Sequence, residues 1–106
     1  MFARKVSMQL KTGRAGDFVK QMENEIIPLL RRQQGFLDEI TLISQTGKEV
    51  YAYSFWQNRD DAERYEKNVF AQVTNLLAGI IEGTLRTHTY TVANSTFHKT
   101  AAAIAS

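Results

Sequence analysis

Few residues of this chain could carry acid–base chemistry near neutral pH. The sequence contains two histidines, His88 and His98, and no cysteine. Because histidine accepts and releases a proton near neutral pH, His88 is a candidate general base. The alternative is a partly exposed strand histidine that bonds to a neighbouring group. His98 adjoins an alanine-rich tail and is not taken as a candidate.

Arg4 is the second candidate, because it alternates with apolar residues. In residues 2–10, Arg4 shares one face of a predicted strand with Phe2, Val6 and Met8. A guanidinium among apolar neighbours needs an anion or hydrogen-bond acceptors. Arg4 could therefore anchor a carboxylate or phenolate of a substrate. Alternatively, it reaches solvent near the strand end or pairs with a glutamate.

Four aromatic residues are candidates for contacts with a substrate: Trp56, Tyr65, Tyr53 and Tyr90. Trp56 either seals the sheet onto the second helix or forms the wall of a pocket for a flat aromatic molecule. Tyr65 lies on a helical apolar stripe and either packs in the core or bonds a ligand. Tyr53 alternates with Tyr51 and Phe55, and such aromatic rows are also typical of dimer interfaces.

Composition excludes several classes of site. Thirteen basic and eleven acidic residues leave a charge of +2, too little to indicate binding of nucleic acid or an anionic membrane. The absence of cysteine excludes disulfides, thiolate nucleophiles and Cys-based metal sites. No phosphate-binding glycine loop, nucleophile elbow or histidine pair at metal spacing is present, so no nucleotide or metal cofactor is expected. The sequence shows no signal peptide or membrane span, and we expect a cytoplasmic protein.

Periodicity predicts the elements that position these residues. Strands are expected over residues 2–10, 36–45, 49–56 and 85–98, and helices over about 14–33 and 58–82. Pro28 predicts a kink near Asn24–Glu25. The second helix is expected to begin at Asn58, could be interrupted at Lys67–Asn68, and should end at Gly83.

The order β-α-β-β-α-β predicts an α+β, ferredoxin-like fold: a four-stranded antiparallel sheet with two helices on one face. One domain is expected over residues 1–98, with a frayed tail at 99–106. Because strand 49–56 is apolar on both faces, the uncovered face is expected to join a second copy in a homodimer. Strand 2–10 should lie between strands 49–56 and 85–98, so Arg4, a tyrosine and His88 converge if the register allows it.

Several short motifs add a family resemblance. They are Pro28, then Gly35-Phe36-Leu37 opening the second strand, Trp56 closing the third, and the polar stretch Asn58-Arg59-Asp60-Asp61. With these, residues 2–95 resemble the antibiotic-biosynthesis-monooxygenase-like (ABM) domains of the dimeric α/β-barrel superfamily. The resemblance implies a homodimer with a pocket between each sheet and its helices. Some members oxidise polycyclic phenols with molecular oxygen and no cofactor, a related group degrades haem, and others are isomerases or have no known activity.

The chain departs from this family at two positions. Many members place a histidine nine residues after the tryptophan, where this chain has Tyr65. Haem-degrading members use an asparagine in the first strand, which has none here. The resemblance implies a cofactor-independent monooxygenase-like enzyme for a small aromatic or polyketide-like molecule. In that case the residue types suggest His88 as the base and Arg4 as the anion holder. A non-catalytic small-molecule-binding dimer and a domain that mainly associates with other chains remain the alternatives.

Overall fold

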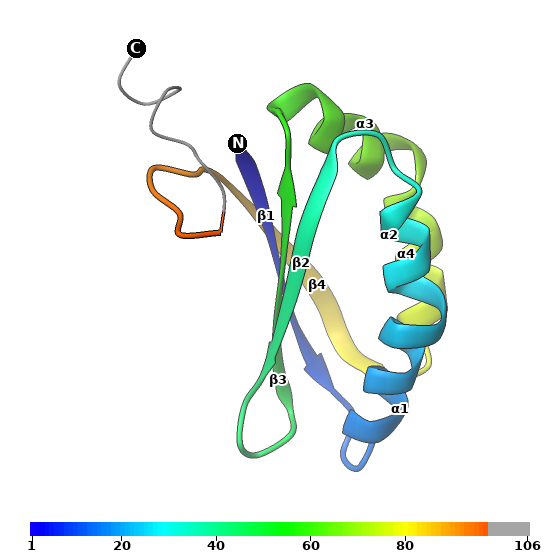
Figure 1. The fold of residues 1–106 in the computed structure, drawn as a ribbon. Helices are drawn as coiled ribbons and strands as arrows, with labels where there is room; N and C mark the ends of the chain where they lie inside the picture. The colour runs from blue at the N-terminus through cyan, green and yellow to red at the C-terminus, as the bar shows by residue number, and fades with distance from the viewer. Residues whose placement is uncertain (98–106) are drawn as a thin grey trace.

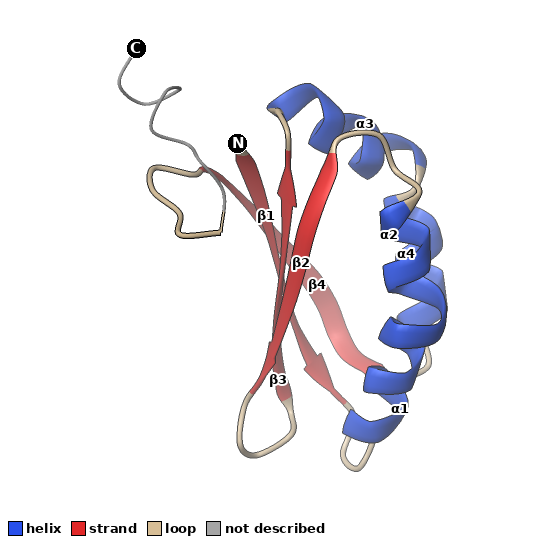
Figure 2. Cartoon of the chain, viewed as in Figure 1, coloured by secondary structure: helices blue, strands red, loops and turns tan. Residues whose placement is uncertain are grey.

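The computed structural model describes residues 1–97, so His98 and the tail predicted at 99–106 lie outside the described residues. Four antiparallel strands form one sheet in the order β2-β3-β1-β4, and the helices cover one of its faces (Figure 1). Figure 2 shows the two layers, with strands on one side and helices on the other. The predicted α+β, ferredoxin-like arrangement is therefore confirmed.

The strands are β1 (Phe2–Leu10), β2 (Phe36–Ile43), β3 (Glu49–Trp56) and β4 (Ile81–Thr91). A first helical segment consists of α1 (Ala15–Gln21), the π-helix η1 (Met22–Ile26) and α2 (Ile27–Arg31). A second consists of α3 (Arg59–Asn68) and α4 (Phe70–Leu77). β1 and β3 have the predicted bounds, because each alternates cleanly along its whole length.

One helix irregularity lies where the sequence predicted it, and a second, predicted at Lys67–Asn68, lies one residue later. The π-helix η1 includes Asn24 and Glu25. Asn24 lies four residues before Pro28, which has no amide hydrogen to donate to the Asn24 carbonyl in a regular α-helical turn. The break between α3 and α4 lies at Val69, whose φ of −126° is not helical. The start of α3 is capped as expected, with Asn58 Oδ1 accepting a hydrogen bond of 2.9 Å from the Asp61 amide.

The last helix and strand differ from the prediction. The helix ends at Leu77 instead of about residue 82, and β4 covers 81–91 instead of 85–98. Gly83 does not end the helix. It lies within β4 with a φ of +79°, where the pairing of β4 with β1 shifts between Ser7 and Gln9. A glycine with positive φ suits such a bulge as well as a helix end, which explains the wrong boundary.

The two faces of the sheet have different surroundings. Val6, Leu10, Val50 and Trp56 on the helix-covered face are buried together with Phe18 and other helix residues. The opposite face, here called the open face, is not covered by any helix of residues 1–97 (Figure 1), although Phe97 borders a hollow there together with Ile40 and Phe55. It carries the exposed side chains of Ile40, Leu42, Tyr51 and Tyr90.

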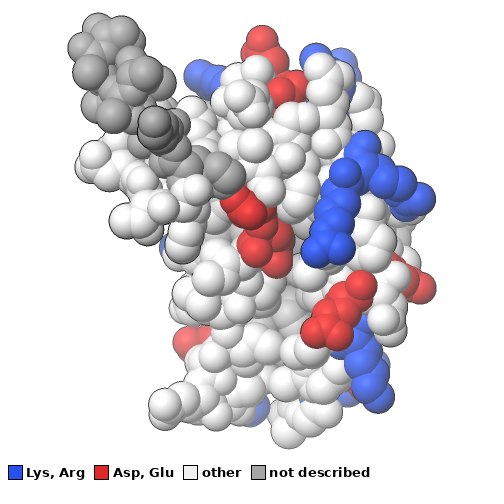
Figure 3. Space-filling view, viewed as in Figure 1, with Lys and Arg blue, Asp and Glu red and all other residues white. Residues whose placement is uncertain are grey.

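The sheet of one chain has two free edges, β2 and β4, and is not a closed barrel. A barrel formed with a second copy stays a prediction. Acidic and basic side chains are interspersed on the visible surface, separated by uncharged areas (Figure 3). None of the helices within residues 1–97 has the length and apolar character required to cross a membrane.

Candidate functional site

A row of polar residues crosses the helix-covered face of the sheet. The strand pairings place Glu39 of β2 beside Ser54 of β3, Ser54 beside Arg4 of β1, and Arg4 beside Thr89 of β4. Directly paired residues carry their side chains on the same face. Four polar side chains therefore lie in line on this face. Arg4 and Ser54 are buried in the mainly apolar core, Glu39 is half-buried, and Thr89 is exposed.

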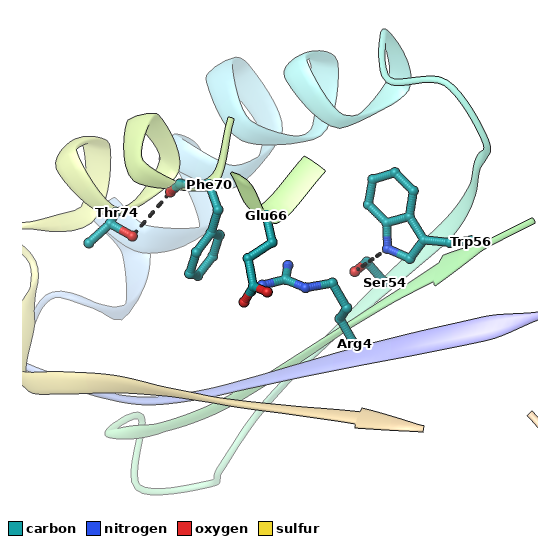
Figure 4. A network of polar contacts seen from close by, with 6 residues as sticks. All are labelled: Arg4, Ser54, Trp56, Glu66, Phe70 and Thr74. Atoms are coloured by element: carbon teal, nitrogen blue, oxygen red, sulfur yellow. Dashed lines mark hydrogen bonds and ion pairs between the residues drawn. The ribbon is translucent and has the colours of Figure 1, made fainter. Parts of the chain in front are cut away.

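Arg4 is the buried cation of this row, with only 3% of its surface exposed. Its Nη2 donates a hydrogen bond of 3.1 Å to Oε1 of Glu66 on α3. The guanidinium carbon lies 4.6 Å from the ring centre of Phe70 and 5.1 Å from that of Tyr65. Figure 4 shows Arg4 rising from β1 toward Glu66 and Phe70. The interpretation that Arg4 pairs with a glutamate is confirmed, and the one in which it reaches solvent is wrong.

Trp56 joins the sheet to α3. Its ring centre lies 4.9 Å from that of Tyr65 and 5.6 Å from that of Phe36, which it meets edge-on. Its Nε1 donates a hydrogen bond of 2.9 Å to Ser54 Oγ (Figure 4). Trp56 is fully buried, so its packing role is confirmed, while a role as a pocket wall stays a prediction.

Burial affects the hydroxyl of Tyr65. Loss of solvent raises its pKa to about 12, although the neighbouring Arg4 guanidinium acts in the opposite direction. The hydroxyl is protonated at neutral pH, as in an exposed tyrosine, and burial keeps it protonated further into the alkaline range, so that it can donate a hydrogen bond. The negative charge of Glu39 contributes to the raised pKa of Tyr65, which places that carboxyl in the same neighbourhood.

Sequence reasoning missed Glu39. Burial raises the pKa of its carboxyl above the usual range, and the hydrogen bond that the Thr41 hydroxyl donates to Oε2 partly counters this. The available signal was the alternation of β2, in which Glu39 and Thr41 share one face and Ile40 and Leu42 the other. This alternation is misleading, because it predicts that Ile40 and Leu42 face the core and that Glu39 and Thr41 face solvent.

A small apolar cavity lies between the sheet and the helices. Its lining includes Met22 and Ile26 of η1, Glu39 of β2, Tyr65 of α3 and Phe70 of α4. Its volume of about 40 Å³ holds a few water molecules. This cavity is called the inner cavity below.

A second space lies beside Arg4 at the surface. Phe2, Arg4, Arg59, Glu63, Glu66 and Thr89 are among the residues that line this hollow of about 230 Å³. It is called the outer hollow below. Arg4 lines the outer hollow, while Tyr65 and Phe70, whose rings flank its guanidinium, line the inner cavity.

The register places His88, Tyr53 and Tyr90 on the open face. His88 and Tyr53 both pair with Lys5, and Tyr90 pairs with Ala3, whereas Arg4 pairs with Thr89. The expected convergence of Arg4, a strand tyrosine and His88 is therefore wrong within one chain, because their positions differ by one residue in register. Tyr53 also borders the inner cavity, although its pairing places its side chain on the open face.

His88 instead borders a hollow of about 600 Å³ on the open face, together with Tyr51, Glu82 and Arg86. The structure thus brings together Arg4, Trp56 and Tyr65 and separates them from the candidate base. Within residues 1–97, no three acidic or histidine side chains gather into a group that could hold a metal ion.

This architecture matches that of solved monooxygenases. A monooxygenase of Streptomyces coelicolor, from the gene ActVA-Orf6 and in complex with nanaomycin D, aligns with a TM-score of 0.76 over 92% of each chain at 16% identity. SnoaB, a cofactor-independent oxygenase of Streptomyces nogalater, aligns with a TM-score of 0.72 over 90% of this chain and 96% of its own, at 15% identity. The chain has the fold of the antibiotic biosynthesis monooxygenases.

The ABM-like resemblance is thereby shown at the level of the fold. A Nitrosomonas europaea protein of unknown function has the same fold at 9% identity, with a TM-score of 0.74 over 90% of this chain and 91% of its own. No sequence-family model and no curated protein sequence matches the chain. At these identities the comparison shows the fold, and the chemistry has to be inferred from the residues at the cavity.

Proposed function

We propose that the protein is a cofactor-independent monooxygenase that oxidises a small aromatic or polyketide-like phenol in the inner cavity. The observation that carries this proposal is that Glu39 and Tyr65 line an apolar cavity, with the Arg4 guanidinium directly behind the Tyr65 ring. These groups are a proton acceptor, a hydrogen-bond donor and a fixed cation. The names of two proteins with this fold, a monooxygenase and a cofactor-independent oxygenase, support the proposal.

The chemistry that these groups suit begins with removal of a proton. A hydroxyanthrone gives up a proton from its ring methylene to the Glu39 carboxylate, and the resulting anion supplies the electrons that reduce molecular oxygen. Overall, the methylene loses two hydrogens, one oxygen atom becomes the new carbonyl oxygen, and the other leaves as water. Arg4 stabilises the anion, and Tyr65 donates a hydrogen bond to its oxygen.

The proposal includes an opening of the inner cavity. Pockets for molecules of this class measure about 300–1,000 Å³, far more than the 40 Å³ available. Met22 and Ile26 of the π-helix η1 form part of the wall. Such helix irregularities are frequent at functional sites, so η1 is the part of the wall that we expect to move.

His88, the base predicted from the sequence, remains the competing candidate. The deciding experiment measures oxygen uptake with a panel of hydroxyanthrones and quinols, using wild type, Glu39→Gln and His88→Ala. Glu39→Gln should lower the rate by about 10²–10⁴-fold, the usual contribution of a general base. His88→Ala, on the open face, serves as the matched control and should retain most of the activity.

Each other result has a distinct meaning. If uptake collapses in His88→Ala and survives in Glu39→Gln, the base lies on the open face and the inner-cavity proposal is wrong. If no compound is oxidised but several bind, the protein is a small-molecule-binding module without this catalysis. If the compounds neither react nor bind, the proposed substrate class is wrong.

We further propose that two copies associate through their open faces. Ile40, Leu42, Tyr51 and Tyr90 expose apolar surface there. The half-buried Tyr53 and Phe55 lie between them on the same face. Exposed apolar surface of this kind is typical of association sites, and two-fold symmetry is the commonest way to cover it. In such a homodimer, His88 would lie at or near the interface.

A further inference from the structure

Arg4 has hydrogen-bonding capacity that the described residues leave unused. A guanidinium carries five N–H donors. One bond goes from Nη2 to Glu66, and the Tyr65 hydroxyl also interacts with the group. The buried Nε has no hydrogen-bond partner among the described residues. A buried donor of this kind is costly and calls for a partner that is absent here.

Glu66 is a weak partner for so deeply buried a cation. Its side chain is 49% exposed, and only its Oε1 contacts Arg4, at 3.1 Å. A half-exposed, single-contact ion pair contributes little and is readily exchanged. Arg4, in contrast, is held in place by central strand β1 and by the rings of Tyr65 and Phe70.

We propose that Arg4 binds a carboxylate of the substrate, and that Glu66 occupies this position when the substrate is absent. The inference rests on the proposed function and names its substrate class as an aromatic acid. A free carboxylate can accept from Nε and Nη2 together, in the two-bond geometry that suits a guanidinium. The outer hollow gives the acid group access to Arg4. The inner cavity has apolar walls for its rings, and Tyr65 and Phe70, which separate the two spaces, have to move apart when the substrate binds.

The charges around the outer hollow favour an anion once Glu66 has moved away. Arg59 and Glu63 both line the hollow, and Arg59 Nε donates to Glu63 Oε1 at 2.8 Å. These two exposed charges neutralise each other. Arg4 is then left as the uncompensated charge, and an acid should bind in preference to a neutral analogue of the same shape.

The test compares a hydroxynaphthoate with the matching hydroxynaphthamide by isothermal titration calorimetry. Wild type should bind the acid more tightly than the amide. Glu66→Gln, which removes the competing carboxylate, should bind the acid about threefold to fivefold more tightly, the contribution of one partly exposed ion pair. The affinity for the amide should not change. Arg4→Lys keeps the charge but loses Nε and the two-bond geometry of the guanidinium, and should reduce the preference for the acid.

Glu63→Gln is the matched control. It removes the same charge from the same hollow, but Glu63 pairs with Arg59 and not with Arg4. If Glu63→Gln and Glu66→Gln strengthen acid binding equally, general electrostatics explains the effect and displacement of Glu66 is wrong. If Arg4→Lys does not fold, the comparison of Glu66→Gln with Glu63→Gln still decides whether the substrate carboxylate displaces Glu66.

Equal binding of acid and amide by wild type overturns the inference, as does failure of both to bind. Oxidation of a neutral hydroxyanthrone separates this failure from that of the proposed function. If the anthrone is oxidised while the acid shows no advantage, the enzyme proposal stands and the carboxylate site does not.

Discussion

Single residues at this site have contrasting surroundings. Arg4 has an anion and two aromatic rings beside it, whereas Glu39 lies near apolar walls that disfavour its charged form. A carboxyl group with a raised pKa is a better proton acceptor than an exposed one. The burial that makes the Glu39 carboxylate costly thus also suits Glu39 to the role of general base that we propose for it.

The raised pKa of Glu39 predicts the pH dependence of oxygen uptake. The carboxylate is the form that accepts a proton, and it becomes the main form only above this raised pKa. Uptake should therefore increase with pH across a range above that of an exposed glutamate. In Glu39→Gln this increase should disappear. A profile of the same shape in wild type and variant would assign the titration to another group.

The same shift predicts an effect on stability. Because the pKa of Glu39 is higher in the folded than in the unfolded chain, its contribution to stability falls as the pH rises from the unfolded to the folded pKa. Glu39→Gln should thus be more stable than wild type at neutral pH, and this advantage should shrink in acid. Urea unfolding of both proteins at neutral and at acid pH measures this difference in the free energy of unfolding. Glu63→Gln, at an exposed position, should show no such advantage, and an equal gain there would contradict the prediction.

The sequence identified Arg4 as a cation in need of a partner, but it could not name Glu66. The two residues are 62 positions apart, and they meet only because α3 crosses over β1. Glu39 was missed for a different reason. Hydrophobicity alone favours burial of Ile40 and Leu42, yet both are exposed on the open face. If a second copy covers that face, the pattern of β2 agrees with the general rule.

At the scale of elements, local signals that act within a few residues were reliable. Asn58 capped its helix, and the helix irregularity came before Pro28, because each effect depends on neighbouring backbone groups. The start of β4 was not predictable in this way. Gly83 is compatible with a helix end and with a bulge, and pairing with β1 decides between them.

The turn before β2 offers a test of close packing. Gly35 has a φ of +80°, and a Cβ at this position would lie 2.1 Å from Asp61 Oδ2. Asp61 is itself held, since its Oδ1 accepts a 2.9 Å bond from Arg64 Nη1 and its amide bonds to Asn58. Gly35→Ala should therefore lower the free energy of unfolding by about 2–5 kcal/mol, from left-handed backbone strain and overpacking together.

Gly13→Ala is the matched control for this change. Gly13 has nearly the same φ, +77°, but no atom lies within 4 Å of an added Cβ. Its cost should be the backbone term alone, about 1–2 kcal/mol. Denaturant unfolding of both variants separates the two effects. Equal losses would show that Asp61 moves aside without cost.

At the scale of the whole molecule, the dominant feature is a sheet covered on one side only. The open face joins apolar residues of β2, β3 and β4 into a continuous surface. The sequence indicated this asymmetry, because β3 is apolar on both faces while the chain has helices for only one. It could not show how a second copy would be placed, since that depends on matching two surfaces in space.

The homodimer proposal predicts a particle of twice the 12.1 kDa chain mass in size-exclusion chromatography with light scattering. Tyr53→Asp should weaken it, because an interface would have to bury an unpaired charge. Gln72→Asp, at an exposed position of α4 on the helix side, should leave the mass unchanged. A wild-type chain that is a folded monomer at micromolar concentration would refute the proposed dimer. An unchanged dimer of Tyr53→Asp would place Tyr53 outside the interface.

The pleat of β1 has a consequence for how this protein can change during evolution. Its even-numbered residues, among them Arg4 and Val6, face the cavity side, and its odd-numbered residues, among them Lys5 and Ser7, face the open side. Alternate residues of this one strand thus contribute to two different surfaces of the protein. Selection on ligand preference and selection on self-association can act on neighbouring codons without interfering. If the proposed substrate and the proposed homodimer both hold, a lineage could alter one while keeping the other.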